Sequence, residues 1–334
     1  MRVESFKYPL PESAVAQEAI EPRHASRLLD TRDMSDHRFL DLPSLLEPGD
    51  LVVVNETRVR SARLWGRRRD TGGGIELLVL EARLDGLWNA LARPSRRLRP
   101  GVEIEMKGLI ASVVEGPEGG VVVVDMKAPD VEAAIAAAGT TPLPPYFHGT
   151  LGDPDRYQTM FARTTGSAAA PTAGLHFTPA VAAGLEQQGI EIASVDLHVG
   201  IDTFRPITAD EIEQHVMHSE WCSISATTAA AISRTRAGGG RVVAVGTTVV
   251  RTLETFANDD RTVGAGEGET DLFLRPGDDF QVVDAMVTNF HVPGSTLVVL
   301  VAAFMGERWR EAYQTALDRG YRFLSFGDAM YAER

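Results

Sequence analysis

Arg241-Val-Val-Ala-Val-Gly-Thr-Thr248, followed by the helix-like run Val249–Phe256, is the stretch that decides the fold. A near-continuous apolar run that ends in glycine and threonine is typical of a buried parallel strand joined to a helix. The same order recurs at Ile190–Leu197, Gln281–Thr288 and Arg322–Ser325, and Leu51–Asn55 adds an earlier apolar strand. We therefore predict an α/β fold with a mostly parallel or mixed sheet flanked by helices.

Polar residues follow these strands directly. Ligands in open α/β sheets bind beyond the carboxyl ends of the strands. We therefore expect one shared rim made of His198, Thr247, Asn289, His291 and Asp328. Helices predicted to begin at Thr248 and Ser295 would offer free backbone N–H groups to an anion at the same rim.

Residues 62–126 have a different pattern, with short strands separated by Gly-, Pro- or Asp-containing turns. The predicted strands are Ala62–Arg67, Ile75–Arg83, Leu87–Ala92, Val102–Met106, Leu109–Glu115 and Val121–Met126. Six short strands with little helix indicate a small antiparallel β-barrel. We expect this barrel domain, residues 58–149, to be inserted into an α/β catalytic domain made of residues 1–57 and 150–334.

The composition is that of an ordinary globular protein, with 334 residues, 44% hydrophobic and 24% charged. No signal-like segment and no apolar run long enough to span a bilayer is apparent, and the single cysteine, Cys222, allows no internal disulfide. These features favour a cytoplasmic protein with no membrane association, and we expect a monomer.

Arginine is concentrated in two short segments although the net charge is −13. One segment holds Arg58, Arg60, Arg63, Arg67, Arg68 and Arg69, and the other holds Arg93, Arg96, Arg97 and Arg99. The planar guanidinium suits phosphate recognition. A basic patch on an acidic protein is typical of a selective polyanion binder, although a solvated face balanced by nearby glutamate is the competing interpretation.

Gly166–Thr178 reads Gly-Ser-Ala-Ala-Ala-Pro-Thr-Ala-Gly-Leu-His-Phe-Thr, and its small residues would let a ligand lie close to the backbone. Thr178 and Pro179 open a further predicted helix as N-cap and first helical residue. A plain structural turn before that helix is the alternative interpretation.

Histidines gather in the second half of the chain, at positions 176, 198, 215, 218 and 291. The spacing of His215 and His218 would place both rings on one face of a helix, with Glu220 just beyond. Such a pair suits a metal, but acid–base or hydrogen-bonding roles are favoured, since imidazole titrates near neutrality. No P-loop, dinucleotide fingerprint or nucleophile elbow is present.

Ordered sequence blocks over nearly the whole chain resemble the S-adenosylmethionine:tRNA ribosyltransferase-isomerases of queuosine biosynthesis. The most specific blocks are Ala170-Pro-Thr-Ala-Gly-Leu-His-Phe177, Leu197-His-Val-Gly200, Thr203-Phe-Arg-Pro206, His215-Val-Met-His-Ser-Glu220, Ala244-Val-Gly-Thr-Thr248 and Thr288-Asn-Phe-His291. The resemblance implies an α/β domain with an inserted β-barrel. It also implies transfer and isomerisation of the ribosyl group of S-adenosylmethionine onto 7-aminomethyl-7-deazaguanine at the tRNA wobble position. The products would be epoxyqueuosine in tRNA, adenine and methionine.

This resemblance implies S-adenosylmethionine as co-substrate, no separate cofactor, no metal, and the anticodon stem-loop of tRNA as partner. The expected catalytic residues are His176, His198, Glu220, His291 and Asp328. The expected substrate-binding residues are Asn55, Arg58, Thr172, Arg205, His215, His218, Thr247, Thr248, Arg251 and Asn289. The expected tRNA-binding residues are Arg63, Arg67, Arg93, Arg96 and Arg97.

Within this set, His176 or His198 is the predicted base for the proton on the 5′ carbon, which the sulfonium acidifies. Glu220 or Asp328 is expected to deprotonate the acceptor amine. Thr247, Thr248 and Arg251 would hold the methionine carboxylate, and Tyr146 or Phe290 would stack on the extruded base.

Three departures from the family pattern, at Asp202, Gly149 and Arg60-Ser61, leave open a paralogue that uses the same donor with another amine or base acceptor. Two other classes of protein also stay open. A metal-dependent hydrolase would use the five histidines, and an RNA-binding module would bind tRNA without chemistry.

Overall fold

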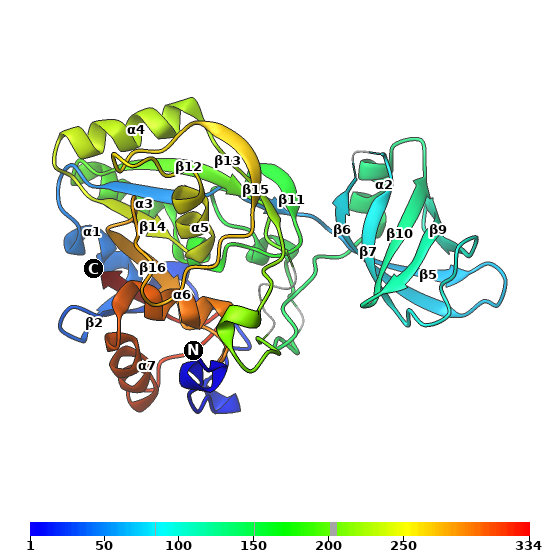
Figure 1. The fold of residues 1–334 in the computed structure, drawn as a ribbon, viewed down its shortest axis with the longest axis horizontal. Helices are drawn as coiled ribbons and strands as arrows, with labels where there is room; N and C mark the ends of the chain where they lie inside the picture. The colour runs from blue at the N-terminus through cyan, green and yellow to red at the C-terminus, as the bar shows by residue number, and fades with distance from the viewer. Residues whose placement is uncertain (84, 150, 201–205) are drawn as a thin grey trace.

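A nine-stranded mixed sheet forms the centre of the larger part of the protein, seen in a computed structural model that describes residues 1–83, 85–149, 151–200 and 206–334 (Figure 1). Its strand order is β15-β13-β12-β3-β14-β16-β17-β1-β2. In that order the strands are Gly266–Thr270, Glu220–Ile224, Glu191–Leu197, Leu51–Asn55, Val242–Val245, Ala285–Asn289, Ala329–Glu333, Arg27–Asp30 and Ser35–Arg38. The predicted α/β class with a mixed sheet is confirmed.

The four central strands, β12, β3, β14 and β16, run parallel, and antiparallel strands flank them on both sides. Every residue of β3, β14 and β16 is buried, which is why these strands read as unbroken apolar runs. Alternate residues serve opposite faces: Val53 and Ala244 pack in one core cluster, whereas Val52 and Val243 pack in another.

Helices cover both faces of this sheet. The first cluster holds residues of α4 (Ala226–Ala237), α5 (Thr247–Thr255), α6 (Thr296–Met305) and α7 (Arg308–Asp318). The second holds residues of α1 (Leu42–Leu45) and α3 (Pro179–Gln187). Burial of apolar surface on both faces is the main source of stability for this layered architecture. None of the helices that the structure describes is long and apolar enough to cross a membrane.

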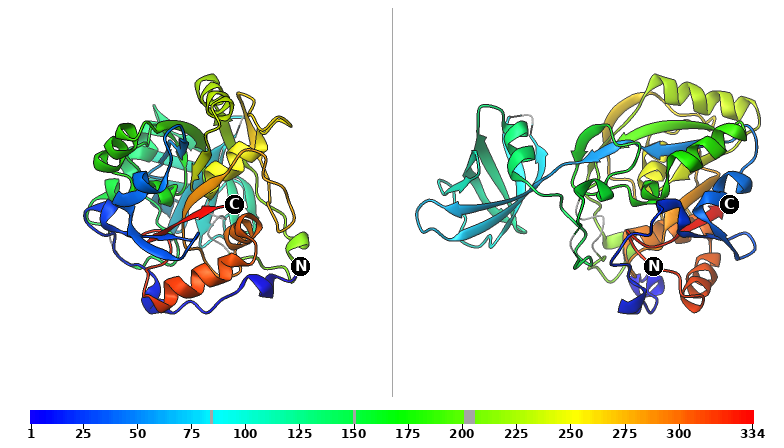
Figure 2. Two further views of the ribbon diagram at one scale, coloured as in Figure 1. Left: turned by 90° about the vertical axis from the view of Figure 1, so that its left-hand side faces the viewer. Right: turned by 180° about the vertical axis from the view of Figure 1, so that it is seen from behind.

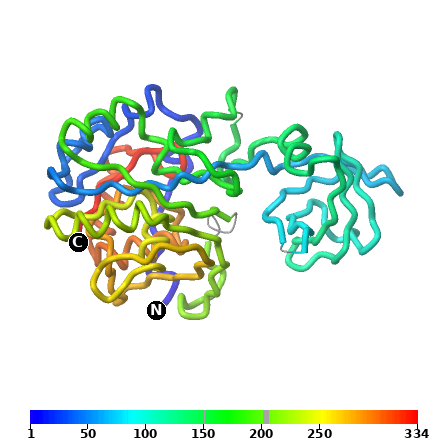
Figure 3. Tube along the Cα trace, turned by 90° about the horizontal axis from the view of Figure 1, so that it is seen from above, coloured from blue at the N-terminus to red at the C-terminus, as the bar shows by residue number. Residues whose placement is uncertain are grey.

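A closed six-stranded antiparallel barrel lies beside this body, in the order β10-β7-β6-β5-β8-β9 (Figures 1 and 3). In chain order its strands are β5 (Arg63–Arg68), β6 (Gly74–Ala82), β7 (Trp88–Arg93), β8 (Glu103–Met106), β9 (Leu109–Glu118) and β10 (Val121–Lys127). Helix α2 (Val131–Ala138) follows and packs on the barrel core. All six predicted strands are therefore confirmed, with ends that shift by one to three residues.

Two chain segments join the barrel to the body (Figure 2). They pair at Arg63 and Thr140, whose backbone N–H groups each donate to the other's carbonyl, at 3.1 and 2.9 Å. Gly139 is needed at this crossing, because a Cβ there would lie 1.7 Å from the carbonyl oxygen of Ser61. On the body side, β4 (Thr57–Val59) pairs with β11 (Thr164–Ser167). The domain limits 58–149 stay a prediction.

The predicted strand Arg322–Ser325 is wrong. This segment is irregular, and the strand is β17, which begins just after Asp328. Because β17 runs antiparallel to β16, its first residue, Ala329, lies opposite Asn289 at the end of β16. Asp328 therefore precedes a strand and still lies at the expected edge of the sheet.

Two smaller expectations also need correction. The predicted strand Gln281–Thr288 begins only at Ala285, because the carboxylate of Glu254 takes the backbone N–H groups of residues 281–283. The segment His215–His218 is not helical but irregular. Thr178 and Pro179 do open α3, although the Thr178 hydroxyl contacts His24 instead of capping the helix.

Candidate active site

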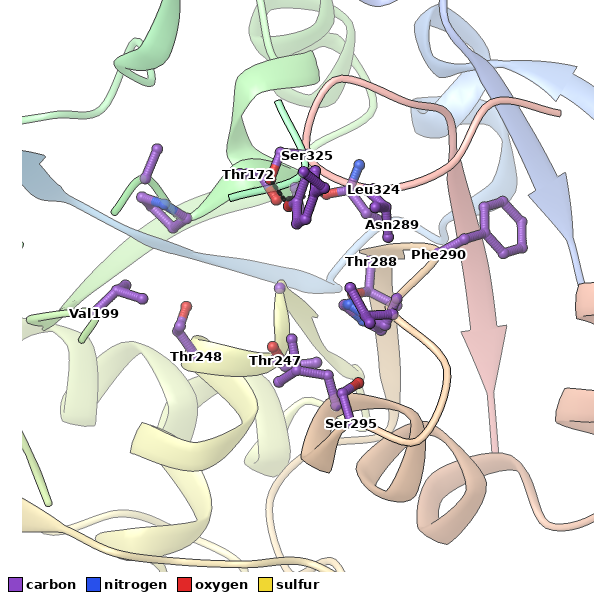
Figure 4. A pocket seen from close by; sticks show the side chains of 18 residues that line it. Thr172, Val199, Thr247, Thr248, Thr288, Asn289, Phe290, Ser295, Leu324 and Ser325 are labelled. Carbon is purple, nitrogen blue, oxygen red and sulfur yellow. Dashed lines mark hydrogen bonds between the residues drawn. The ribbon is translucent and has the colours of Figure 1, made fainter. Parts of the chain in front are cut away.

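A cavity with about 570 Å³ of empty space, including its open mouth, lies at the carboxyl ends of the central strands. Its wall comes from several separate segments, namely Tyr146, 170–173, Val199, 246–248, 288–292, Ser295, Leu297, Leu324 and Ser325 (Figure 4). Of the five residues expected at the rim, Thr247, Asn289 and His291 line this cavity, and His198 and Asp328 do not. Thr172 and Thr248, which were expected to bind substrate, also line it.

Two helix N-termini converge on this cavity. Helix α5 begins at Thr247 after Gly246, whose φ of 91° is a left-handed conformation that favours glycine. Helix α6 begins after Ser295, whose hydroxyl accepts the Val298 N–H and caps the helix. First-turn N–H groups have no acceptor within their own helix, so both ends present donors and positive potential to the same space. This arrangement suits a carboxylate.

His291 is the histidine that lines this cavity. Its Nε2 lies 2.9 Å from the Thr288 hydroxyl, and Thr288 Oγ1 is the one described group that hydrogen-bonds this ring. Complete burial lowers the pKa of His291 to about 3. The imidazole is therefore neutral at pH 7 and keeps an unprotonated nitrogen that can accept a proton.

His176 contacts the cavity wall through Asn289. The Asn289 side chain accepts from the Thr172 hydroxyl through Oδ1 (2.9 Å), and its Nδ2 donates to the carbonyl of Asp328 (3.3 Å). These partners fix the amide orientation, so the same Nδ2 donates to His176 Nε2 at 3.1 Å. The ring must then carry its proton on Nδ1, which donates to the Ser26 hydroxyl at 2.7 Å.

Both nitrogens of His176 are thus occupied, and Phe39 stacks on the ring at 4.9 Å. Burial, followed by the nearby Arg322 and Arg23 guanidinium groups, lowers the pKa of His176 to about 3. The ring lines a second, smaller space of about 300 Å³ whose wall shares Ser325 with the first. These contacts make His176 a residue that positions Asn289, and they argue against the expected role of free base.

Glu220 and Arg251 form a buried ion pair beside the loop after β12. Glu220 Oε2 accepts from Arg251 Nη1, and Oε1 accepts the Gly200 N–H at 2.7 Å. Arg251 also donates to the carbonyls of Leu272 and Thr270, at 3.0 and 3.1 Å. Neither residue lines the cavity. The Arg251 guanidinium thus has three protein acceptors, and Glu220 links it to the backbone of Gly200. The predicted roles of Glu220 in catalysis and of Arg251 in substrate binding stay predictions.

His198 packs against Trp221, with ring centroids 4.5 Å apart and ring planes tilted by 41°, and its Nε2 lies 3.6 Å from Asp196 Oδ2. Gly166 packs on its ring, where a Cβ would lie 2.1 Å from His198 Cε1. The neighbour Val199 lines the cavity, but His198 does not. The expectation that His198 shares the pocket wall is therefore wrong.

Asp328 is buried and accepts backbone N–H groups of Arg27 and Arg322 at 2.9 and 2.8 Å, so its carboxylate fixes two chain segments and does not line the cavity. Asn55 is buried behind the wall, where its Nδ2 contacts Leu197 O (3.0 Å) and Thr248 Oγ1 (3.3 Å). Arg58 is exposed on β4 and lies 3.8 Å from Asp155. The predicted roles of these residues in chemistry or substrate binding stay untested.

The five histidines do not share one site. Of the five, His291 lines the cavity, and His215 packs edge-on against Phe273, with ring centroids 5.7 Å apart. Burial, followed by His218, lowers the pKa of His215. Among the residues described, no group of three or more His, Cys, Asp or Glu side chains could hold a metal ion. Arg205 and Asp202 lie outside the described residues.

Phe290, expected to stack on a base, points away from the cavity into an aromatic cluster with Tyr313 and Phe323 (Figure 4). Tyr146 does line the cavity, and its hydroxyl contacts Ser325. Several wall or supporting residues were not among the expected site residues, namely Ser26, Thr288 and Ser325, although Thr288 stands in one of the blocks that resemble the family. Serine and threonine are too common to be chosen before the fold shows what they contact.

The arginines of the two basic segments fall into two groups. Arg63 pairs with Glu76 (3.2 Å), Arg68 with Asp70 (2.6 Å), and Arg69 with Glu103 (2.9 Å). Arg93, Arg96, Arg97 and Arg99 are exposed and make no ion pair with any residue that the structure describes. The second cluster therefore has the more available positive charge. Arg60, one of the departures from the family pattern, pairs with Glu132 of α2.

The model of the family described as "Queuosine biosynthesis protein" matches residues 3–332. This chain belongs to that family. Proteins named S-adenosylmethionine:tRNA ribosyltransferase-isomerase from Moorella thermoacetica and Symbiobacterium thermophilum are each 50% identical over 339 residues, covering 99% of this chain and 99% of each relative. The crystal structure of the Thermotoga maritima S-adenosylmethionine tRNA ribosyltransferase is similar over 98% of this chain and 99% of that chain, with 37% identity and a TM-score of 0.55. Membership of the family agrees with the resemblance drawn from the sequence blocks.

Proposed function

We propose that this protein is an S-adenosylmethionine:tRNA ribosyltransferase-isomerase of queuosine biosynthesis. Relatives with this name match it from end to end at about 50% identity, and the cavity at the ends of the parallel strands carries the proposal in the structure. S-adenosylmethionine is the co-substrate and tRNA the acceptor. No observation favours a metal-dependent hydrolase or a paralogue with another acceptor.

The cavity is the donor site in this proposal. The methionine carboxylate is held at the N-termini of α5 and α6, near Thr247, Thr248 and Ser295, because the first residue of α5 and the N-cap residue of α6 line the cavity. The ligand lies against the small residues Ala170–Ala173, which leave the backbone accessible. At the opposite wall, hydrogen bonds with Thr172 and His176 hold the side-chain amide of Asn289, which carries both a donor and an acceptor.

His291 is our candidate for the base that removes the 5′ proton. It is the titratable imidazole in the wall, and burial keeps it neutral at pH 7. A neutral imidazole has a nitrogen that can accept a proton, although its lowered pKa makes His291 a weaker base than an exposed histidine. His176 assists through Asn289 only, since its own acceptor nitrogen is occupied.

Finer aspects of the activity follow as part of the same proposal. The acceptor is the 7-aminomethyl-7-deazaguanine base at the wobble position, reached through the anticodon stem-loop, and the products are epoxyqueuosine in tRNA, adenine and methionine. The enzyme acts in the cytoplasm as a monomer and needs no further cofactor. Tyr146, which lines the cavity, is placed to contact the extruded base.

The test incubates the protein with S-adenosylmethionine and tRNA that carries the deazaguanine base. We expect stoichiometric release of adenine and methionine that depends on both substrates. Activity unchanged by a chelator distinguishes this reaction from metal-dependent hydrolysis. Binding of tRNA without adenine release would leave only an RNA-binding protein and would refute the proposal.

A further inference from the structure

Trp65 stands exposed on the outer surface of the barrel. It lies on β5, where residues alternate between the barrel interior and solvent, and 63% of its surface is accessible. Its neighbours Leu64 and Gly66 face inward, and a Cβ at Gly66 would lie 2.5 Å from the Met106 side chain. The register of β5 therefore fixes the indole in solvent, which is unusual for so large an apolar side chain.

Charged residues surround Trp65 on the same face. In antiparallel strands, directly opposed residues share a face, so Trp65, Glu76 and Arg93 form a row across β5, β6 and β7. Arg63 and Arg67 flank Trp65 along β5, two residues away on either side. Three guanidinium groups thus surround the indole, against two carboxylates on the same face, Glu76 and Glu105, and Arg63 engages Glu76 at 3.2 Å.

The surface beside the indole is open. Gly74 lies opposite Arg67 and has no atom within 4 Å of the position of a Cβ. Glu105, across Arg67 on β8, contacts Arg69 at 3.8 Å. No aromatic ring or guanidinium of any described residue stacks on Trp65. The indole and Arg93 are therefore available to a ligand, whereas Arg63 engages Glu76 and Arg67 donates to the Gly72 carbonyl.

We propose that Trp65, with Arg63, Arg67 and Arg93, is a stacking platform for an unpaired nucleotide of the tRNA, outside the donor cavity. Aromatic side chains on barrel surfaces stack on bases, while neighbouring arginines contact phosphates. This platform lies on the barrel and the cavity lies at the sheet of the body, so the tRNA is held at two separate places. The inference depends on the proposed function, which supplies tRNA as the partner.

Charge and area favour RNA over a protein partner. The protein is acidic overall, with a net charge of −13, so a locally basic face selects a polyanion. Among the described residues of the barrel, Val114 is the other large apolar side chain that is exposed. It lies on β9, which does not pair with β5. One indole among arginines gives too little contiguous apolar area for a stable protein interface.

The test titrates the full-length protein with tRNA and follows intrinsic tryptophan fluorescence, because a base stacked on an indole quenches its emission. Of the other three tryptophans, Trp88 and Trp309 are buried and Trp221 is half-buried, so the exposed Trp65 should give the main change, and the W65F titration shows what Trp221 contributes. We expect W65A to weaken tRNA binding about 10-fold, the size of one lost base stack. W65F should keep most of the affinity, since a ring remains, but should lose the quenching.

The matched control is V114A, which shortens an exposed side chain elsewhere on the same barrel and should bind tRNA like the wild type. In steady-state assays, W65A should raise KM for tRNA and leave KM for S-adenosylmethionine and kcat unchanged. Equal tRNA affinity of W65A and V114A, or quenching that persists in W65F, would overturn the inference. If W65A fails to fold, the W65F titration decides. A wild-type protein that releases no adenine instead refutes the proposed function, whatever Trp65 does.

Discussion

Asn289 donates a hydrogen bond from its side-chain amide to Nε2 of His176, at 3.1 Å, and the two residues come from segments 113 positions apart. One of them lines the cavity and the other lies behind it. This contact determines which tautomer the histidine adopts and which way the amide points. Because both ring nitrogens of His176 are engaged, the contacts favour a supporting role for this histidine over the role of base that the sequence block Ala170–Phe177 predicts.

Replacing His176 by alanine should lower kcat/KM by about 10- to 100-fold, as loss of a supporting hydrogen bond typically does. The reason is that the Asn289 amide loses the partner that orients it. The measurement is adenine release by H176A, N289A and the double variant. We expect the double variant to be little worse than the worse single variant. Strictly additive losses would mean that the two residues act independently.

Alanine at His291 should abolish adenine release while S-adenosylmethionine still binds, because His291 is the imidazole in the wall. Calorimetric titration measures binding, and product analysis measures turnover. His198→Ala is the comparison variant, since His198 packs against Trp221 outside the cavity wall. Near-normal turnover of H291A, together with an inactive H198A, would assign the base to His198 instead.

Stability should fall with acidity below about pH 6.5, because the pKa values of His176 and His291 are lowered to about 3 in the folded protein. In the unfolded chain both rings titrate near 6.5 and bind protons that the folded chain rejects. The free energy of unfolding therefore decreases as pH drops, by about 1.4 kcal/mol per pH unit for each ring, down to about pH 3. Urea unfolding between about pH 7.5 and pH 5 tests this. H176N should show a shallower slope than the wild type, and equal slopes would contradict the buried neutral ring.

Truncation of Arg251 should destabilise the protein by about 3–5 kcal/mol, because it removes the cation of a buried ion pair and takes a donor from the carbonyls of Leu272 and Thr270. The matched control is Arg234→Ala, which breaks an exposed ion pair with Glu191 and should cost about 0–1 kcal/mol. Chemical denaturation of both variants gives the comparison. Similar small decreases in the free energy of unfolding of the two variants would show that the buried ion pair contributes no more to stability than the exposed one.

Removing the carboxylate from the donor should weaken binding if the N-termini of α5 and α6 hold it. A hydrogen-bonded charge at such a place contributes about 1.5–3 kcal/mol, so a decarboxylated analogue should bind roughly 10- to 100-fold more weakly. Competition against S-adenosylmethionine measures this ratio. An analogue that competes equally well would move the carboxylate to another part of the cavity.

The sequence by itself determined the elements of the fold and their order. Apolar runs such as Leu51–Asn55 and Val242–Val245 can only be buried strands, and their residues are all buried. The six barrel strands were equally clear, because alternation and turn residues are local signals. The rim positions Thr247, Asn289 and His291 followed from the rule that parallel strands end at one edge.

Tertiary structure alone decided which side chains face the cavity. Histidines 176, 198 and 291 cannot be told apart in the sequence. Their surroundings differ in the structure, because some contacts join segments more than 100 residues apart and others are local. Asn289 engages His176, Trp221 covers His198, and Thr288 holds His291. Asp328 lies at the expected edge only because β17 runs antiparallel to β16. Local patterns record burial and periodicity, whereas the role of a polar group depends on its partner, and the chain supplies that partner only when it folds.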